Sequence, residues 1–339
     1  MTQYDLTGFD EDPTALTDAL PGYRFPVQWK DGLVSRLPAP EGPFGLDFDY
    51  TEINDSGLGE LAGLKKLTRL SLRGTPQVTD AGMRNLARLD GLQWLNLATE
   101  RLTDDGIKEL AKLRHLQLLD LGSTRITDRA LRELAAMPRL HSLFIGGTRI
   151  TDAGLKELAG LTEIRTLYLD YTQITGTGLK DLSGLKKLQT LDLERTKITS
   201  ATIKKLIAFT RLGKLRLSRT AVENSDLKEL SRLEHLHSLY LNDTQITDRG
   251  LAELAPLTRL HTLDLGGTNV TNANLKDLAS LENLHTLHLY RTAVTDAGMK
   301  ELTRLKKLRL LNLYNTSVTD AGVSELNFAL PECRFIRLK

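Results

Sequence analysis

Residues 119–128, LDLGSTRITD, recur almost unchanged as residues 263–272, LDLGGTNVTN. The threonine at the sixth position of this segment returns along the chain as Thr51, Thr75, Thr124, Thr148, Thr172, Thr196, Thr220, Thr244, Thr268, Thr292 and Thr316. Glu100 fills the one missing slot, after a one-residue insertion near Pro76. The spacing gives twelve units of 24 residues, one of them extended to 25. A fixed period of about 20 to 50 residues indicates a repeat protein.

Each unit divides into two halves. The Leu-x-Leu half alternates apolar and polar residues with a period of two, which predicts a short strand with inward leucines. The Thr-Asp-x-Gly-Leu-Lys-Glu-Leu half offers Thr or Asp as a helix N-cap, and its leucines recur three or four residues apart. One unit cannot bury its own leucines, so neighbouring units must stack. We therefore predict an α/β solenoid that is right-handed and curved, with a parallel sheet on its concave face and helices on its convex face.

The repeat Leu-x-x-Leu-x-x-Leu-x-Leu-x-x-Thr-x-Ile-Thr-Asp-x-Gly-Leu resembles the leucine-rich-repeat superfamily over roughly residues 45 to 339. Its second half is similar to the cysteine-containing subclass, and its threonine is similar to a variant common in environmental bacteria. The family usually carries Asn or Cys at the threonine, and that Asn bonds backbone groups of the neighbouring turn. The resemblance implies that each Thr hydroxyl does likewise more weakly, and that Glu100 interrupts the ladder. It leaves the function open, because the family hosts many functions.

The two ends of the chain depart from the repeat. Residues 1–44 hold six of the ten prolines, and the first 23 residues carry five acids without Lys or Arg. We predict an N-terminal cap with an acidic leader at residues 1–44, twelve leucine-rich repeats at 45–325, and a truncated C-terminal capping repeat at 326–339. The end of a solenoid exposes core leucines unless it is covered, so we expect a cap built from Phe25, Val27, Trp29, Leu33 and Leu37. A docking tail is the alternative for the leader.

The composition limits the classes of partner and compartment. With 45 basic and 43 acidic residues, the net charge of +2 gives no strong field for nucleic acid or an anionic membrane. The single cysteine, Cys333, excludes an internal disulfide and indicates a reducing compartment. The N-terminal residues do not resemble a signal peptide, and no apolar run approaches the ~20 residues that span a bilayer. We expect a cytoplasmic monomer, with a secreted effector as the alternative.

Side chains between and after the inward leucines are expected to line the concave face. These positions vary while the leucines barely change, and they hold six of the eight tyrosines. Tyr and Arg are enriched at protein interfaces, because they combine an apolar body with a polar tip. The preference of tyrosine for strands is the other explanation for these tyrosines. Strands favour Val, Ile and Thr as well, however, and these residues are almost absent from the same positions.

We therefore predict a partner-binding surface made of two patches. The first comprises Phe144, Tyr168, Asp170, Tyr171, Asp192, Glu194, Arg195, Arg216 and Arg219. The second comprises Tyr240, His288, Tyr290, Arg291 and Tyr314. The partner is expected to be a protein that docks on the concave face.

The sequence contains no catalytic motif that we recognise. His-Glu-x-x-His, Gly-x-x-x-x-Gly-Lys, Gly-x-Ser-x-Gly and a cysteine pair are all missing. Carboxylate pairs such as Asp170 with Asp192 are expected on an open sheet, where nothing excludes water or raises a pKa. We expect neither an enzyme nor a cofactor. The leading hypothesis is a non-enzymatic protein-binding scaffold, and the alternative is a bacterial effector or internalin-like adhesin that binds a host protein.

Three histidines, His237, His261 and His285, fill the same slot in successive units, so their rings are expected about 5 Å apart. Such a strip could bind a transition metal or respond to pH. Gln93, Gln117 and Gln189 fill this slot elsewhere, so free polar variation explains the run better than a metal site does.

We predict that the histidine strip binds no metal. Titration calorimetry with Zn²⁺ or Ni²⁺ should detect no tight site. One tight site that disappears in His261→Ala would contradict this prediction.

Overall fold

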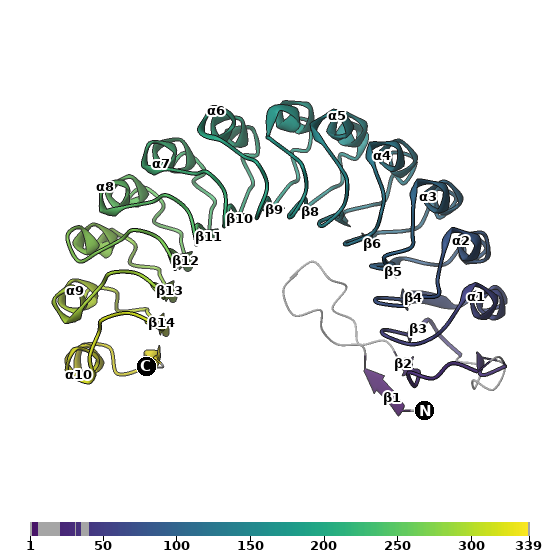
Figure 1. Ribbon diagram of the computed structural model, residues 1–339, viewed down its shortest axis with the longest axis horizontal. Coiled ribbons are helices and arrows are strands. Elements are labelled where there is room, and N and C mark those ends of the chain that lie inside the picture. Colours follow the sequence, from purple (N-terminus) through teal and green to yellow (C-terminus); the bar gives the residue numbers. More distant parts are fainter. Residues whose placement is uncertain (1, 6–20, 31, 35–40, 338–339) are drawn as a thin grey trace. The chain divides into compact units, whose positions relative to one another are not determined.

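The computed structural model describes residues 2–5, 21–30, 32–34 and 41–337 of the chain. Its internal contacts divide it into two compact units, unit 1 at Met1–Gln173 and unit 2 at Ile174–Lys339. Within each unit the strands lie on the concave side and the helices on the convex side (Figure 1). The predicted α/β architecture, with parallel strands joined by helical segments, is confirmed.

Unit 1 contributes eight strands among the described residues: β1 Thr2–Asp5, β2 Pro21–Arg24, β3 Phe44–Asp47, β4 Leu67–Ser71, β5 Trp94–Asn96, β6 Leu118–Asp120, β7 Ser142–Phe144 and β8 Thr166–Tyr168. Its helical segments are α1 Asp55–Leu61, α2 Asp80–Leu86, α3 Asp104–Leu110, α4 Asp128–Leu134, α5 Asp152–Leu155 and the 3₁₀ turn η2 Lys156–Gly160. The α-helices are at most seven residues long, so packing against their neighbours must stabilise them.

Unit 2 contributes seven strands: β9 Thr190–Asp192, β10 Lys214–Arg216, β11 Ser238–Tyr240, β12 Thr262–Asp264, β13 Thr286–His288, β14 Leu310–Asn312 and β15 Arg334–Ile336. Its helical segments are η3 Thr177–Leu182, α6 Ser200–Ile203, η4 Lys204–Ala208, α7 Asn224–Leu230, α8 Asp248–Leu251, η5 Ala252–Leu254, η6 Leu275–Ser280, α9 Asp296–Leu302 and α10 Asp320–Ala329. Several repeats therefore form a 3₁₀ helix where the sequence predicted an α-helix. No helix among the described residues has the length and apolar character needed to cross a bilayer.

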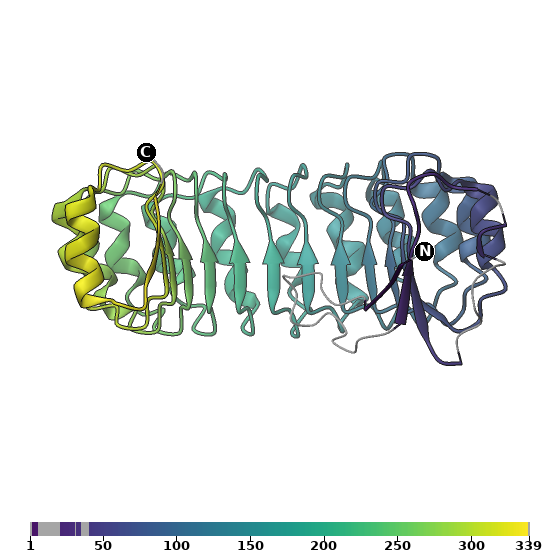
Figure 2. The ribbon, with the colours of Figure 1, turned by 90° about the horizontal axis from the view of Figure 1, so that it is seen from below.

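The inward leucines hold the strands in register within each unit. Leu119 pairs with Leu95 on one side and with Leu143 on the other, and all three side chains are fully buried. From β2 onward, the strands within each unit run in the same direction (Figure 2). Among the described residues, the antiparallel pairing is that of β1 with β2, while β2 itself pairs parallel with β3.

Aromatic residues cover the N-terminal end of the unit 1 core. Phe25 stacks on Phe48 with ring centroids 4.1 Å apart, and Trp29 packs edge-on against Phe48 at 5.6 Å. Val27 is 62% exposed, so its predicted place in the cap core is wrong. It was misread because an apolar residue beside Phe25 and Trp29 fits the pattern without facing inward. Leu37 lies outside the described residues.

The hydroxyl of each repeated threonine forms a hydrogen bond within its own repeat. The hydroxyl of Thr124, for example, donates to the carbonyl of Leu121 at 2.7 Å, and the same bond recurs from Thr51 to Thr316. The expected bond to a neighbouring turn occurs in the irregular unit, where Thr99 donates to the carbonyl of Thr75 at 2.9 Å. Glu100 itself is exposed. At the regular positions the single hydroxyl donor is used within its own turn, so it tightens that turn instead of joining two.

The side-chain hydrogen bonds that join neighbouring repeats lie at the helix N-termini. Oδ1 of Asp104 accepts from the backbone N–H of Thr127 at 2.7 Å, and Oδ2 accepts from the Thr127 hydroxyl at 2.7 Å. We call this arrangement a rung. Equivalent rungs start at Asp55, Asp80, Asp128, Asn224, Asp248, Asn272 and Asp296. With Asn224 and Asn272, the amide donates to the hydroxyl instead.

The rung explains the helix glycine of the repeat. A Cβ added at Gly82 or Gly106 would come within 2.5 Å of the rung carboxylate of the preceding unit, Asp55 or Asp80. Unit 2 shows the reverse case at its start, where Gly176 and Ser200 stand in place of the rung acid. The helix glycine is then replaced as well, by Thr202 and Asp226, and both side chains are buried. Ala130 and Asn274 are exceptions, because each follows a repeat with a rung but is not a glycine. In the second case the helix η6 begins only after Asn274.

We predict that Asp104→Ala lowers the free energy of unfolding by about 2 kcal/mol, because two charge-assisted hydrogen bonds to Thr127 are lost. The neighbouring Asp105 is exposed and in the same first helical turn, but it forms no rung. Asp105→Ala is therefore the matched control, and it should cost less than about 1 kcal/mol. Urea unfolding of both variants checks the difference. Equal losses would show that the rung contributes nothing beyond the helix dipole.

Candidate protein-binding face

The concave face of each unit is built from the side chains that alternate with the inward leucines. Asp120 ends β6 between Leu119 and Leu121, which are fully buried, and therefore faces outward from the sheet. The same alternation puts the residue two positions earlier on this face. That column contains Arg69, Trp94 and Leu118 in unit 1 and Lys214 in unit 2. The sequence analysis omitted it, although the period of two was sufficient to find it.

Asp120 and its equivalents at the ends of the other strands form what we call the central column, and this column has a structural role that the sequence analysis did not anticipate. Oδ1 of Asp120 accepts from the backbone N–H of Gly122 at 2.9 Å, which closes the turn after the strand. The same bond is made by Asp47, Asn96, Asp192, Asp264 and Asn312. Asp and Asn favour such turns because their side chains bond the backbone two residues on. This column therefore contains turn residues as well as candidate contacts.

A second constraint acts three residues after the central column. Eleven of the twelve repeats have a residue in the left-handed conformation there, and in three of them it is a glycine, Gly74, Gly147 or Gly267. The other eight are Tyr50, Ser123, Tyr171, Arg195, Arg219, Asp243, Arg291 and Asn315, with φ between 51° and 59°. A left-handed conformation costs a residue with a Cβ roughly 1–2 kcal/mol. In the irregular unit, Thr99 does not share this conformation.

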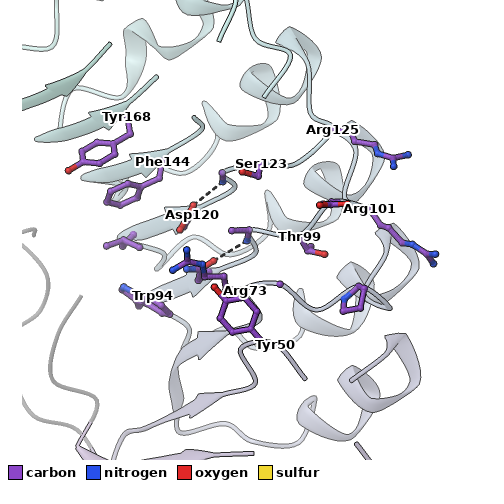
Figure 3. Close-up of a pocket in the computed structure, with 17 residues that line it drawn as sticks. Tyr50, Arg73, Trp94, Thr99, Arg101, Asp120, Ser123, Arg125, Phe144 and Tyr168 are labelled. Carbon is purple, nitrogen blue, oxygen red and sulfur yellow. Dashed lines mark hydrogen bonds between the residues drawn. The ribbon is translucent and has the colours of Figure 1, made fainter. Parts of the chain in front are cut away.

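Unit 1 contains a hollow of about 1010 Å³ on this face. Tyr50 and Arg73 lie at one end, and Phe144 and Tyr168 lie at the other (Figure 3). The space between them exists because Ala98, Gly122 and Ser123 carry little or no side chain there. Trp94, Leu118 and Asp120 also line the hollow, and the ring of Phe144 meets that of Tyr168 edge-on at 4.7 Å.

Asp120 is held in an environment that disfavours its charge. Burial, together with the neighbouring carboxylates of Asp170 and Asp49, raises its pKa to about 6, although the Gly122 N–H and Arg73 oppose the shift. Burial also raises the pKa of Asp264, the equivalent residue of β12, to about 6. The expectation that nothing on this face raises the pKa of a carboxylate is therefore wrong. Neighbouring side chains bury the central column more deeply than an open sheet suggests.

Unit 2 pairs its charges on the same face. Nε of Arg216 lies 3.1 Å from Asp192 and its Nη2 lies 3.0 Å from Glu194, while its guanidinium lies over the ring of Tyr240 at 5.2 Å. Asp243 forms ion pairs with Arg219 at 3.1 Å and with Arg291 at 3.7 Å. These pairs stabilise one another's orientation and present a network of mixed charge.

The remaining residues of the second predicted patch also lie in unit 2. Burial lowers the pKa of His288, and burial beside Asp264 and Asp243 raises the pKa of Tyr290 to about 12. The two rings are 6.3 Å apart. Tyr314 is 44% exposed.

The first predicted patch is divided between the units. Phe144, Tyr168, Asp170 and Tyr171 belong to unit 1, and Asp192, Glu194, Arg195, Arg216 and Arg219 belong to unit 2. Tyr171 is 46% exposed, whereas Asp192 is 3% exposed and is occupied by its turn bond and by Arg216. The missed neighbours of the unit 1 group are Trp94, Leu118, Asp120 and Arg73.

The histidine strip lies beside the strands of unit 2. The ring centroids of His237 and His261 are 6.5 Å apart, and those of His261 and His285 are 5.1 Å apart. Burial and the neighbouring positive charges of His261 and Lys214 lower the pKa of His237. Among the residues described, no group of three or more His, Cys, Asp or Glu side chains is arranged to hold a metal ion.

We predict that Asp120→Asn stabilises the protein at pH 7 by about 1–3 kcal/mol, since a carboxylate whose pKa is raised on folding destabilises the folded state above that pKa. Asn96 and Asn312 show that the amide makes the same turn bond. The folded carboxylate takes up its proton near pH 6, before the unfolded one does. The advantage of the variant should therefore shrink as the pH falls from 7 towards 4. Denaturant unfolding at several pH values checks this, and a variant that is less stable at pH 7 would contradict it.

Comparison with known proteins gives the family of the repeat. Two family models, both described as leucine-rich repeat, match residues 138–198 and residues 112–135 and 232–255. No curated protein matches the sequence.

Similar solved structures extend the likeness to most of the chain. An internalin (inlF) from Listeria monocytogenes is 26% identical, with a TM-score of 0.66 over 86% of this chain and 79% of its own. Internalin C2 of the same organism is 28% identical, with a TM-score of 0.50 over 71% of this chain and 91% of its own. A leucine-rich-repeat protein of Leptospira interrogans, 20% identical, shares the fold with a TM-score of 0.56 over 86% of this chain and 89% of its own. The repeat, the parallel sheets and these likenesses agree that the chain is a leucine-rich-repeat protein.

Proposed function

We propose that the protein is a non-enzymatic scaffold that binds a protein partner on its concave face. The contacts are assigned to Phe144, Tyr168, Asp170 and Tyr171 in unit 1, and to Asp192, Glu194, Arg195, Arg216, Arg219, Tyr240, His288, Tyr290, Arg291 and Tyr314 in unit 2. No cofactor, metal, nucleic acid or membrane takes part in this proposal. The protein acts as a monomer.

One observation carries the proposal. Gly74, Gly147 and Gly267 have the left-handed conformation without a steric penalty, so the fold accepts glycine at this position. Tyr171 and Arg195 have the same conformation at a cost to folding. A sheet that only had to fold would gain stability from glycine throughout the column. Large tyrosine and arginine side chains in a penalised conformation are therefore explained by what they contact.

The rest of the face supports binding more than catalysis. Tyr and Arg are the side chains that dominate the binding energy of protein interfaces. The rungs and paired leucines give a preorganised backbone, so binding orders few additional groups. The two carboxylates whose pKa is raised to about 6, Asp120 and Asp264, each accept a backbone N–H bond that closes a turn, which is a structural use rather than a catalytic one.

A second candidate function is that of a secreted effector or adhesin. The likeness to two Listeria monocytogenes internalins is the observation that favours it. The single, buried Cys333 fits a reducing compartment and favours a cytoplasmic protein, which we propose as the first choice. Fractionation of the native host cells, with detection by an antibody to the protein, separates the two.

We predict that Tyr168→Ala combined with Tyr171→Ala weakens capture of the partner by about 2 kcal/mol or more, because both side chains face outward and supply an aromatic anchor. Folding should remain nearly intact, since neither residue belongs to the leucine core. Affinity capture from the native lysate identifies the partner, and titration of the purified partner measures the change.

The chain offers a matched control for this experiment. Phe328 is 93% exposed on α10, which lies on the convex side of unit 2 (Figure 1), so Phe328→Ala removes an aromatic residue without touching the concave face. It should leave capture unchanged. If the double tyrosine variant captures the same partner as well as the unaltered protein does, the concave-face proposal is wrong.

A further inference from the structure

We infer that the hollow of unit 1 receives a basic side chain, Lys or Arg, of the partner protein, with Asp120 as its carboxylate and the rings of Trp94 and Phe144 beside it. This inference rests on the proposed function and names the chemistry of one contact within it. It concerns unit 1 alone.

The register of the strands brings these groups together. Asp120 of β6 pairs directly with Phe144 of β7, and Leu118, two residues earlier on the same face, pairs with Trp94 of β5. Neighbouring strands are about 4.8 Å apart, so the carboxylate has an aromatic ring next to it on one strand and another diagonally across on the other. In Figure 3, Trp94, Asp120 and Phe144 project from the sheet on the same side.

Only one of the two carboxylate oxygens of Asp120 accepts a hydrogen bond from the described residues. Oδ1 accepts from the Gly122 N–H, and within the described part of the chain no cation forms an ion pair with either oxygen. The guanidinium of Arg73 influences Asp120 through its charge, but it packs over the ring of Tyr50 at 5.8 Å. Asp120 lines the hollow, so its second oxygen is available to a group that enters.

The surrounding charges select a cation. The carboxylates of Asp170 and Asp49 act on Asp120 together with the single guanidinium of Arg73, which makes three acids to one base at this point. Arg101, Arg125 and Glu100 also line the hollow. Figure 3 shows the guanidinium ends of both arginines pointing away from Asp120. An anionic guest would meet like charge, whereas a cation gains from the carboxylate and from the faces of the aromatic rings.

Unit 2 contains the filled version of this arrangement. Asp192, Arg216 and Tyr240 occupy the central column of three consecutive strands, and Arg216 is held between the carboxylate and the ring. In unit 1 the strand after Asp120 supplies Phe144, and the next supplies Tyr168. The carboxylate and the rings are present, and no cation of the described residues forms an ion pair with Asp120. A partner's Lys or Arg side chain completes the set.

The test uses the full-length protein and a small probe. N-acetyl-arginine amide or N-acetyl-lysine amide is titrated while the indole N–H signal of Trp94 is followed by NMR, with Trp29 of the same chain as an internal reference. We expect a saturable shift of the Trp94 signal alone. The neutral N-acetyl-citrulline amide should give no saturable shift. An equal response to citrulline would overturn the inference.

Two matched variants sharpen the test. Asp120→Asn keeps the turn bond and should weaken probe binding at least tenfold at pH 7.5. Asp264→Asn removes the equivalent carboxylate of unit 2 and should leave the Trp94 response unchanged. For the unaltered protein, binding should weaken as the pH falls through 6, because Asp120 then takes up a proton. A probe that binds Asp120→Asn as tightly as the unaltered protein would overturn the inference.

The partner experiment separates this inference from the proposed function. If Asp120→Asn captures the partner fully while the double tyrosine variant does not, the cation contact is wrong and the concave-face scaffold stands. If both tyrosines can be removed without effect but Asp120→Asn loses the probe, the hollow binds cations and the proposed partner face is wrong.

Discussion

The rung between the aspartate of one repeat and the threonine of the next repeat is the interaction on which the regular stacking of repeats depends. It satisfies a helix N-terminus, which otherwise leaves backbone N–H groups without partners, and at the same time it fixes the spacing of neighbouring units. Because the carboxylate of Asp80 occupies the space beside the next helix, a glycine, Gly106, fits best there. The Asp and the Gly of two consecutive repeats are thus linked, with Ala130 and Asn274 as the exceptions.

The concave face is subject to a different pair of constraints. The central column must end a strand, which Asp and Asn do through their turn bond, and the left-handed column favours glycine. Both constraints leave the chemistry of the exposed side chain free within limits. Arg216 shows how that freedom is used, since it replaces a turn residue and in exchange binds Asp192 and Glu194. The backbone is therefore uniform while the charge pattern differs from strand to strand.

Much of the fold could be predicted from the sequence, because leucine spacing determines which residues are buried. Leu119 and Leu143 were placed correctly by alternation alone. The rung was harder to predict, since it joins residues 23 or 24 apart whose relation appears only when two units are stacked. The hollow could not be predicted from single columns, because it results from small residues in two neighbouring columns, Ala98 and Gly122 in one and Ser123 in the next. Trp94 and Asp120 were consequently missed as site residues, although the alternation pointed to their face.

Asp120 illustrates how the demands of folding and binding can be separated at one position. Asn96 and Asn312 make the same turn bond without a charge, so the turn does not require a carboxylate. The raised pKa of Asp120 shows that its charge is unfavourable in the folded protein, because burial disfavours the ionised form. Groups that reduce stability tend to occur where a function needs them. A cation that enters the hollow removes this penalty at the moment of binding, so the free energy lost in the unbound protein is recovered as affinity for a basic side chain.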